Sequence, residues 1–224
     1  MEKSFDVEKL IEPKSHFPAP WTLKGEGIIM VYNFKKDWLE KNGLWRLGPS
    51  EIYRGGLGFV MLVNYHESPV GPYKELLIIP GKYNPHKRQS ISHIFVDSEK
   101  STDNGRYNWG IPKETVPMIW QTEGDLDTIG IGSEENPILY CEIKTRNIPF
   151  PATTRLLPIR LHQVLGGKTF LTDPNGSGWA KLAKIEKLCI DANRFPDISQ
   201  VRPLLCFKVN PFIMHFPLSQ IDDH

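Results

Sequence analysis

Short apolar runs separated by turn residues recur along this chain of 224 residues, and their spacing predicts strands more often than helices. Each run is five to eight residues long, contains β-branched or aromatic side chains, and is bounded by glycine, proline or polar residues. Such lengths and compositions are typical of β-strands. The five runs lie at residues 27–32, 58–65, 75–79, 91–96 and 137–143.

Helical patterns are fewer. Residues 35–42 are predicted to form a short helix that ends at Gly43, because glycine suits the left-handed position after a helix. Residues 179–190 carry a lysine at every third position, a period that by itself predicts a helix. The stretch that follows Val96 is interpreted as a polar loop.

The first 20 residues contain three prolines and predict an irregular N-terminal arm, residues 1–20. No internal repeat or low-complexity tract divides the remainder, so residues 21–224 are predicted to form a single domain with a sizeable core. The 18 glycines and 19 prolines favour many short elements joined by turns over a helical bundle. The predicted fold class is therefore α+β, mostly β.

Charge and composition exclude several classes of protein. The 27 Lys and Arg residues nearly cancel the 26 Asp and Glu residues, so we expect neither nucleic acid nor a membrane as a partner. Apolar residues at 40% and charged residues at 24% are ordinary for a globular protein and exclude intrinsic disorder. The N-terminus lacks a secretion signal pattern, and we therefore expect a cytoplasmic protein.

The spacing of metal-ligating and cofactor-binding residue types points to no cofactor. Three widely separated cysteines form no CxxC pair, and the seven histidines form no HxxxH or HxH pair, so no metal site is predicted. The glycines of residues 54–58 match neither a Walker loop nor a dinucleotide-binding fingerprint. No GxSxG motif is present, which removes the commonest hydrolase signal.

Two segments carry candidate chemistry. In the first, residues 65–77, a turn rich in proline and glycine leads Glu75 into an apolar run. In the second, residues 105–114, Lys113 follows a proline, with Trp109 just upstream. Each has an ordinary alternative: a glutamate at a strand start usually faces solvent, and a lysine after a proline is usually a surface charge in a turn.

Taken together, the two segments resemble the acetoacetate decarboxylase family. In that family a strand carries a glutamate into the pocket, and a Gly-Arg, five residues, Pro-Lys motif then supplies a Schiff-base lysine. Glu75 lies 38 residues before Lys113, and Gly105-Arg106 and Pro112-Lys113 keep that spacing. The resemblance implies a closed, strongly curved β-barrel with a buried apolar pocket, a few peripheral helices and a homo-oligomer. It also implies a strand at residues 179–190, against the three-residue period.

The resemblance assigns roles to individual residues. Lys113 would be the Schiff-base nucleophile and Glu75 its acid/base or orienting partner. Independently of the resemblance, Tyr73, His93 and Arg106 are candidate polar anchors for a substrate that is bound without a covalent bond, and Trp109 and Ile111 are candidate apolar walls. A lysine attacks a ketone only as the free amine, whereas its ordinary pKa is about 10.4. Burial or a neighbouring cation lowers that pKa, and acetoacetate decarboxylase is itself a standard example of such a lysine.

The chain departs from the family pattern in two places. The decarboxylases follow the nucleophilic lysine with a second lysine, and Glu114 stands there in this chain. They also carry an arginine near the N-terminus that meets the substrate carboxylate, whereas residues 21–27 contain no arginine and Lys24 does not match the motif. Desolvation would therefore have to activate Lys113, and a β-keto acid loses a binding partner.

Three functional hypotheses follow, each with a small-molecule partner and no cofactor. The first is a lysine-dependent lyase that acts on a carbonyl metabolite by decarboxylase, aldolase or dehydratase chemistry. The second is a non-covalent cyclase or isomerase of a larger apolar metabolite, of the kind found in secondary metabolism. The third is a ligand-binding protein without catalytic activity.

Overall fold

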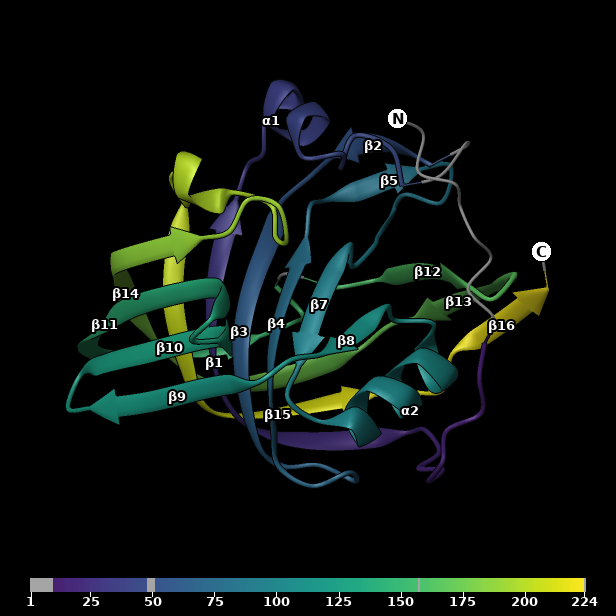
Figure 1. Cartoon of the computed structure of the whole chain (residues 1–224), viewed down its shortest axis with the longest axis horizontal. Helices are drawn as coiled ribbons and strands as arrows, with labels where there is room; N and C mark the ends of the chain where they lie inside the picture. The colour runs from purple at the N-terminus through teal and green to yellow at the C-terminus, as the bar shows by residue number, and fades with distance from the viewer. Residues whose placement is uncertain (1–9, 48–50, 157, 224) are drawn as a thin grey trace.

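The computed structural model describes residues 10–47, 51–156 and 158–223, and most of them form β-strands (Figure 1). The larger sheet has ten strands, in the spatial order β8 (Lys113–Thr115), β7 (His93–Val96), β4 (Tyr73–Ile79), β3 (Gly58–Glu67), β1 (Trp21–Tyr32), β15 (Leu205–Phe216), β14 (Asn175–Ile190), β11 (Asn136–Thr153), β10 (Leu126–Ser133) and β9 (Met118–Glu123). The smaller sheet has six, in the order β16 (Gln220–Asp223), β13 (Lys168–Thr172), β12 (Leu161–Leu165), β6 (Arg88–Gln89), β5 (Lys82–Asn84) and β2 (Ile52–Gly55). The described helices are α1 (Lys36–Lys41), α2 (Glu99–Trp109) and the 3-10 helix η1 (Ile198–Gln200).

The strands predicted from the apolar runs are confirmed, since the five runs lie in β1, β3, β4, β7 and β11. The helix predicted at residues 35–42 is confirmed as α1. Its end has the expected geometry, because Gly43 has a φ of 68° and Leu44 N donates back to Leu39 O at 2.7 Å.

Residues 179–190 form part of β14, so the helix indicated by the lysine period is wrong and the strand implied by the family resemblance is confirmed. The physical reason is a β-bulge. Lys184 pairs with Lys144 and Lys187 pairs with Glu142, which leaves Glu186 as an extra residue in β14. The bulge shifts the alternation of side chains by one residue, so Lys184 and Lys187 lie on the same face of the strand although they are three positions apart.

The polar loop predicted after Val96 is wrong, because this stretch contains α2. The Ser98 side chain accepts from Ser101 N at the start of the helix, and Gly110 adopts a φ of 61° after its end. The buried face of α2 is made mostly of small polar residues and glycine instead of an apolar stripe: Ser101, Thr102, Asn104, Gly105 and Trp109. Hydrophobic periodicity therefore gave no signal for this helix.

The prediction of a closed barrel is wrong for the part of the chain that the structure describes. The ten-stranded sheet ends at β8 and β9, which do not pair with each other. The chain crosses this gap directly: Val116 N donates to Val96 O at 2.9 Å, and Gly132 N donates to Pro117 O at 2.9 Å. Pro117, in the connection between β8 and β9, has no N–H to donate. The connection therefore contacts both edges of the sheet, but no ladder of hydrogen bonds joins β8 to β9.

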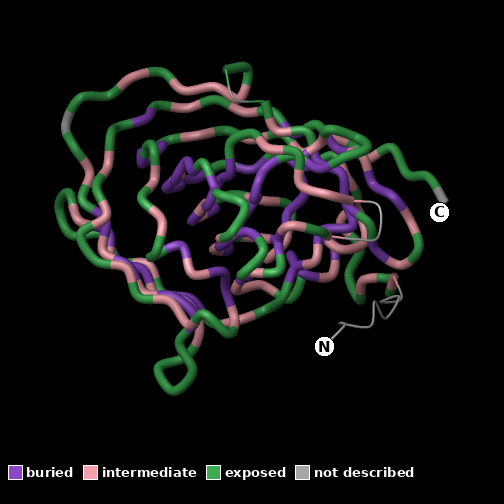
Figure 2. The backbone as a smooth tube through the Cα atoms, turned by 90° about the horizontal axis from the view of Figure 1, so that it is seen from above, coloured by how far each residue is buried: buried purple, intermediate pink, exposed green. Residues whose placement is uncertain are grey.

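The sheet is rolled, and its two faces belong to two hydrophobic cores. One core collects side chains from both ends of the sheet, such as Phe95 of β7 and Met118 of β9, and therefore fills the inside of the roll. Viewed from above, the backbone winds around this buried interior (Figure 2). The second core lies on the opposite face and includes Leu77 of β4, Trp109 of α2 and Leu161 of β12. The candidate site belongs to the second core.

A buried charged cluster lies on the first face and consists of Lys208, Asp127 and Glu26. Lys208 Nζ donates to Asp127 Oδ1 at 2.7 Å and to Asp127 Oδ2 at 2.8 Å, and it lies 2.9 Å from Glu26 Oε2. The three residues are 8%, 1% and 8% exposed, respectively. This Lys208 cluster links β15, β10 and β1.

The described part of the predicted N-terminal arm packs against α2. Phe17 N donates to Asn104 Oδ1 at 2.7 Å, and Asn108 Nδ2 donates to Phe17 O at 2.9 Å. Residues 1–9 of the predicted arm lie outside the described residues. Neither α-helix in the described ranges has the length and hydrophobicity needed to span a bilayer.

Candidate active site

Lys113 is placed by the turn of the chain at the end of α2. The helix follows β7 and leads into β8, which pairs with β7 in parallel, with Ile94 opposite Lys113. Gly110 ends the helix in the left-handed region, and Lys113 N donates to Ile111 O across Pro112 at 2.8 Å. Lys113 is thus the first residue of β8, and its side chain runs back along α2.

Gly105 gives the lysine side chain its path along the helix. A Cβ atom at this position would lie 2.7 Å from Lys113 Cδ and 2.8 Å from Lys113 Cε, closer than carbon atoms approach without displacement. The glycine of the sequence motif is therefore explained by packing: only glycine leaves room on α2 for the lysine eight positions later.

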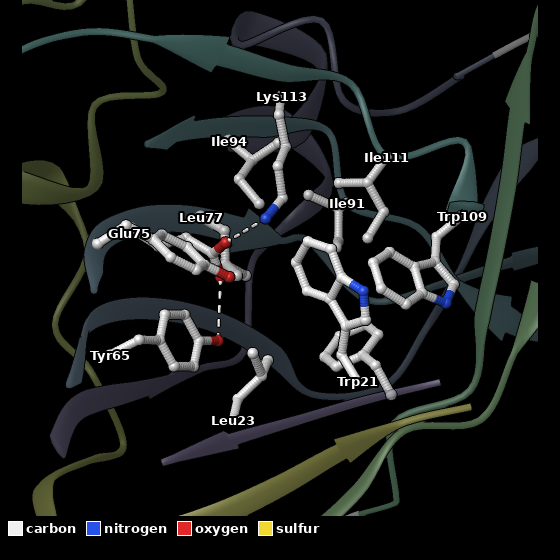
Figure 3. A pocket seen from close by; sticks show the side chains of 12 residues that line it. Trp21, Leu23, Tyr65, Glu75, Leu77, Ile91, Ile94, Trp109, Ile111 and Lys113 are labelled. Atoms are coloured by element: carbon white, nitrogen blue, oxygen red, sulfur yellow. Dashed lines mark hydrogen bonds and ion pairs between the residues drawn. The ribbon is translucent and has the colours of Figure 1, made fainter. Parts of the chain in front are cut away.

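The Lys113 amine and the Glu75 carboxylate form a buried ion pair, and Figure 3 shows them pointing at each other. Lys113 Nζ donates to Glu75 Oε2 at 2.8 Å, and both side chains are 5% exposed. The same nitrogen donates to Ser101 Oγ at 3.0 Å and lies 5.1 Å from the centre of the Tyr73 ring. In a site of this kind, proton transfer from nitrogen to carboxylate exchanges two charged groups for two neutral ones.

Two tyrosines cover the carboxylate. The hairpin of β3 and β4 pairs Tyr65 with Tyr73, and their ring centres are 4.7 Å apart. Tyr65 OH donates to Glu75 Oε1 at 3.4 Å. Burial, followed by the nearby Glu75 charge, raises the pKa of each tyrosine well above its ordinary value of 10.0. Both phenols therefore keep their protons at neutral pH and can donate hydrogen bonds.

The rest of the cavity is apolar. Besides the charged pair and the two tyrosines, it is lined by Trp21, Leu23, Leu77, Ile91, Ile94, Trp109, Ile111 and Phe216. Its volume is about 20 Å³, room for about one water molecule. The Lys113 cavity is therefore too small to hold a metabolite in this structure.

An aromatic wall closes the end of the cavity that lies away from Glu75. Trp21 and Trp109 meet edge to face with ring centres 4.9 Å apart, and Trp109 meets Phe216 at 5.3 Å. Trp21 Nε1 donates to Phe17 O at 3.0 Å, and Trp109 Nε1 donates to Pro217 O at 2.7 Å. Both indole N–H groups are thus directed to backbone carbonyls outside the cavity.

The structure brings most of the residues selected from the sequence into one place. Tyr73, Trp109 and Ile111 line the cavity together with Lys113 and Glu75.

Two of the selected residues lie elsewhere. His93 precedes Ile94 on β7 and therefore faces the other side of the sheet, where its ring is 6.1 Å from that of Phe195. Arg106 is half-buried on α2 and is not among the residues that line the cavity.

The two departures from the family pattern also have definite positions. Glu114 is exposed and, as the residue after Lys113 in β8, points away from the cavity. Lys24 is 48% exposed and pairs with Glu67 at 2.8 Å. Neither side chain contributes a charge to the cavity lining.

Sequence reasoning missed Ser101, Tyr65, Trp21, Leu23, Leu77, Ile91, Ile94 and Phe216. Tyr65 was detectable from the hairpin, since a tight β3–β4 register places it on the same face as Tyr73 and Glu75. Ser101 required recognition of α2, and Phe216 required knowledge that β15 lies beside β1. Among the described residues, no group of three or more His, Cys, Asp or Glu side chains is arranged to hold a metal ion.

The sequence of the chain is similar to that of two curated plant proteins. No family model matches the chain. It is 26% identical over 174 residues to Protein NEOXANTHIN-DEFICIENT 1 of Arabidopsis thaliana, a match covering 70% of the chain and 60% of that protein. The protein of the same name from Oryza sativa subsp. japonica is 28% identical over 108 residues, covering 47% and 35%. The chain thus spans less than two thirds of the length of the curated relatives that it matches.

Solved structures give the fold. Acetoacetate decarboxylase from Legionella pneumophila subsp. pneumophila str. Philadelphia 1 superposes with a TM-score of 0.67 at 14% identity, over 100% of this chain and 99% of that one. The chain has the acetoacetate decarboxylase fold. The enduracididine biosynthesis enzyme MppR shares this fold, with a TM-score of 0.64 at 13% identity over 93% of the chain and 90% of the enzyme. So does an acetoacetate decarboxylase-like enzyme from Sphingomonas wittichii RW1, with a TM-score of 0.62 at 13% identity over 93% and 94%.

Replacement of Gly105 by alanine tests the packing of Lys113 in this acetoacetate decarboxylase fold. The new methyl group overpacks the lysine and is expected to cost about 1–3 kcal/mol, more than the roughly 1 kcal/mol that alanine gains over glycine in a helix. Urea denaturation measures the net loss. Asp103→Ala on the same helix is the control, and a Gly105→Ala protein more stable than the wild type would contradict the contact.

Alkaline pH is expected to destabilise the protein. The pKa of Tyr65 and of Tyr73 is raised from 10.0, and burial raises the pKa of Cys206 from 9.0 to about 12. The unfolded chain releases these protons first, so the contribution of these groups to the free energy of unfolding falls as the pH rises towards and above their ordinary pKa values. The expected slope is up to about 1.4 kcal/mol per pH unit for each group.

Urea denaturation between pH 8 and pH 11 measures this slope. Tyr65→Phe removes one of the titrating groups and should reduce the slope accordingly. A free energy of unfolding that stays constant to pH 11 would contradict the burial of these groups in their neutral form.

Proposed function

We propose that the protein is an enzyme that forms a Schiff base between Lys113 and the carbonyl group of a small metabolite. The observation that carries this proposal is the contact of 2.8 Å between Lys113 Nζ and Glu75 Oε2 inside an apolar cavity. An amine nucleophile needs a base that removes its proton, and Glu75 lies within hydrogen-bonding distance for that role. The acetoacetate decarboxylase fold supports the proposal.

The proposed steps move one proton to Glu75 and back, so the total charge of Lys113 and Glu75 is the same at the end as at the start. Glu75 takes one proton from the Lys113 ammonium, and the free amine attacks the carbonyl carbon to give a carbinolamine after proton transfer to oxygen. Glu75 then returns its proton to the departing hydroxyl group, which leaves as water and yields the iminium. Ser101 Oγ, at 3.0 Å from Nζ, holds the nitrogen in place during these steps.

The iminium withdraws electrons from the adjacent carbon atoms, and this promotes removal of an α-proton, the step on which aldolase and dehydratase chemistry depends. Glu75 and Tyr65 are the groups positioned to accept or donate that proton. MppR has been determined in complex with the condensation product of pyruvate and imidazole 4-carboxaldehyde. That complex supports lyase or aldol-type chemistry as the reaction class to test first.

Borohydride trapping tests the proposal. The protein is incubated with a panel of ketones and aldehydes, reduced with sodium borohydride and analysed by intact mass. We expect one adduct per chain, with the mass of the carbonyl compound less one oxygen atom, and none in Lys113→Met. Lys24→Met, which removes an exposed lysine, is the matched control. No adduct with any compound, or an adduct that persists in Lys113→Met, would contradict the proposal.

A second candidate, a non-covalent cyclase or isomerase, is favoured by one specific observation. The Lys113 nitrogen already faces Glu75, Ser101 and the Tyr73 ring, an arrangement that suits a permanently charged ammonium. The name of the plant relatives refers to neoxanthin, which supports an apolar metabolite as ligand. The ¹⁵N chemical shift of Lys113 Nζ at pH 7 separates the candidates: an ammonium that stays charged with ligand bound supports the second, and conversion to an imine supports the first.

A further inference from the structure

We propose that the Lys113 cavity accepts an uncharged carbonyl compound with a hydrocarbon body and excludes keto acids. This inference rests on the proposed function for the reacting carbonyl group, but its basis is the charge and hydrogen-bonding capacity of the cavity. Of the residues that line it, Lys113 and Glu75 carry charge, and they neutralise each other at 2.8 Å.

A substrate carboxylate would disturb this balance. The iminium keeps the single positive charge of Lys113, and Glu75 is again a carboxylate once it has returned its proton to the departing hydroxyl group. A carboxylate on the substrate would add a negative charge at a position where no second cation lines the cavity. Burial of an unpaired charge is strongly unfavourable, so the site selects against such substrates.

The nearby cations of the described chain do not compensate. Lys24 follows Leu23 on β1, points to the other side of the strand and pairs with Glu67 at 2.8 Å. Lys208 lies on the opposite face of the sheet, 2.7 Å from Asp127 Oδ1. Arg106 is not among the lining residues. No rotation of one side chain about its own bonds carries the Lys208 ammonium through the sheet to the cavity.

The wall at the far end offers hydrocarbon contact alone. Figure 3 shows Trp21 and Trp109 side by side, with Trp109 farther from the ion pair than Trp21. Their N–H groups donate outward, to Phe17 O and to Pro217 O. The other wall residues, Leu23, Ile111 and Phe216, have no polar side-chain atom. A hydroxyl or amide on this part of a substrate would lose its hydrogen bonds to water without replacement, whereas an alkyl or aromatic group gains by burial.

Entry of such a body requires the wall to open, because the free volume is about 20 Å³. The two backbone carbonyls that hold the indoles lie in segments without regular structure, the arm before β1 and the link between β15 and β16. A ligand that fills the cavity must therefore move the tryptophans, and their fluorescence reports its binding independently of any covalent step.

Three matched compounds test the inference: 2-heptanone, methyl 3-oxooctanoate and 3-oxooctanoate. The second and third differ by the negative charge, and the third yields the first on loss of carbon dioxide. We expect quenching of tryptophan fluorescence by both neutral compounds at concentrations at least about tenfold lower than by the acid. Borohydride trapping of the same three compounds is expected to follow the same order.

An engineered cation provides the reverse test. Leu23→Arg places a guanidinium in the wall and is expected to reverse the preference towards 3-oxooctanoate, with Leu23→Met as the control for altered packing. The comparison of the three compounds on the unmodified protein does not depend on whether the arginine variant folds.

The outcomes separate this inference from the proposed function. Selective quenching by the neutral compounds without any trapped adduct would overturn the Schiff-base proposal and support the inference. Trapping or quenching by 3-oxooctanoate as efficient as that by its methyl ester would overturn the inference and leave the Schiff base standing. Quenching by none of the three compounds up to their solubility limits would also overturn it.

Discussion

Replacement of Glu75 by glutamine is expected to lower the free energy of unfolding by about 3–5 kcal/mol, because the Lys113 ammonium is then buried without a counter-ion. Both side chains are 5% exposed, so water cannot replace the lost partner without rearrangement of the site. Glutamine retains the shape of the side chain and its hydrogen bond with Tyr65, which isolates the effect of charge. Urea denaturation at pH 7 measures the loss.

A double-mutant cycle separates the pair from its surroundings. Lys113→Met combined with Glu75→Gln removes both charges and keeps the volumes similar, so the double variant is expected to recover most of the stability lost by Glu75→Gln. The exposed pair of Lys24 and Glu67 is the matched control. Glu67→Gln is expected to change the stability by less than about 1 kcal/mol. A double variant as unstable as Glu75→Gln would show that the loss does not come from the unpaired ammonium.

The same substitution separates stability from catalysis. If Glu75 removes the lysine proton, Glu75→Gln lowers the rate of adduct formation by about 10²- to 10⁴-fold, measured under conditions where the variant is fully folded. A pair with a structural role alone would leave that rate unchanged once folding is restored.

Two short motifs, taken together with their resemblance to the acetoacetate decarboxylase family, were sufficient to find the pair of Glu75 and Lys113. Glu75 and Lys113 are each embedded in a short motif, and Gly105 keeps its spacing from Lys113 because the lysine chain passes directly over the helix at that point. The alternation of side chains between the two faces of β7 could also be predicted from the sequence. Since Ile94 enters the cavity, its neighbour His93 had to face the opposite core.

Other features depend on distant segments and could not be predicted locally. The aromatic wall joins Trp21, Trp109 and Phe216, which come from the beginning, middle and end of the chain. Helix α2 escaped detection because its buried face is polar and small. Whether the sheet closes is decided by hydrogen bonds between β8 and β9, and the apolar pattern of a strand is the same at an open edge as in a closed ladder.

The Lys208 cluster is the clearest case, since Glu26, Asp127 and Lys208 are separated by about 80 to 100 residues and none stands in a recognisable motif. Besides Lys208, the carboxylates receive hydrogen bonds from Asn64 Nδ2, Asn210 Nδ2, Trp120 Nε1 and Thr122 Oγ1. Asn64, Thr122 and Asn210 would each be interpreted as surface residues from sequence alone.

Replacement of Lys208 by methionine is expected to destabilise the protein at pH 7 by at least about 3–5 kcal/mol, because it leaves two carboxylates facing each other with no cation between them. The remaining hydrogen-bond donors stabilise the carboxylates but do not neutralise them, and the titratable side chain that faces Glu26 is His66, with Nε2 at 3.5 Å from Glu26 Oε1. In this variant the folded protein takes up protons more readily than the unfolded chain, so the free energy of unfolding rises as the pH falls. Recovery between pH 7 and pH 5 is therefore the diagnostic result.

Urea denaturation at both pH values measures this recovery, with Lys144→Met as the control. Lys144 pairs with Asp125 at 3.6 Å, and both side chains are at least 50% exposed, so its replacement is expected to cost less than about 1 kcal/mol at either pH. A loss in Lys208→Met that is the same at pH 7 and pH 5 would indicate lost packing and not repulsion between Glu26 and Asp127. A loss that disappears at low pH would show that the charge of Lys208, rather than the volume of its side chain, holds β1, β10 and β15 in register.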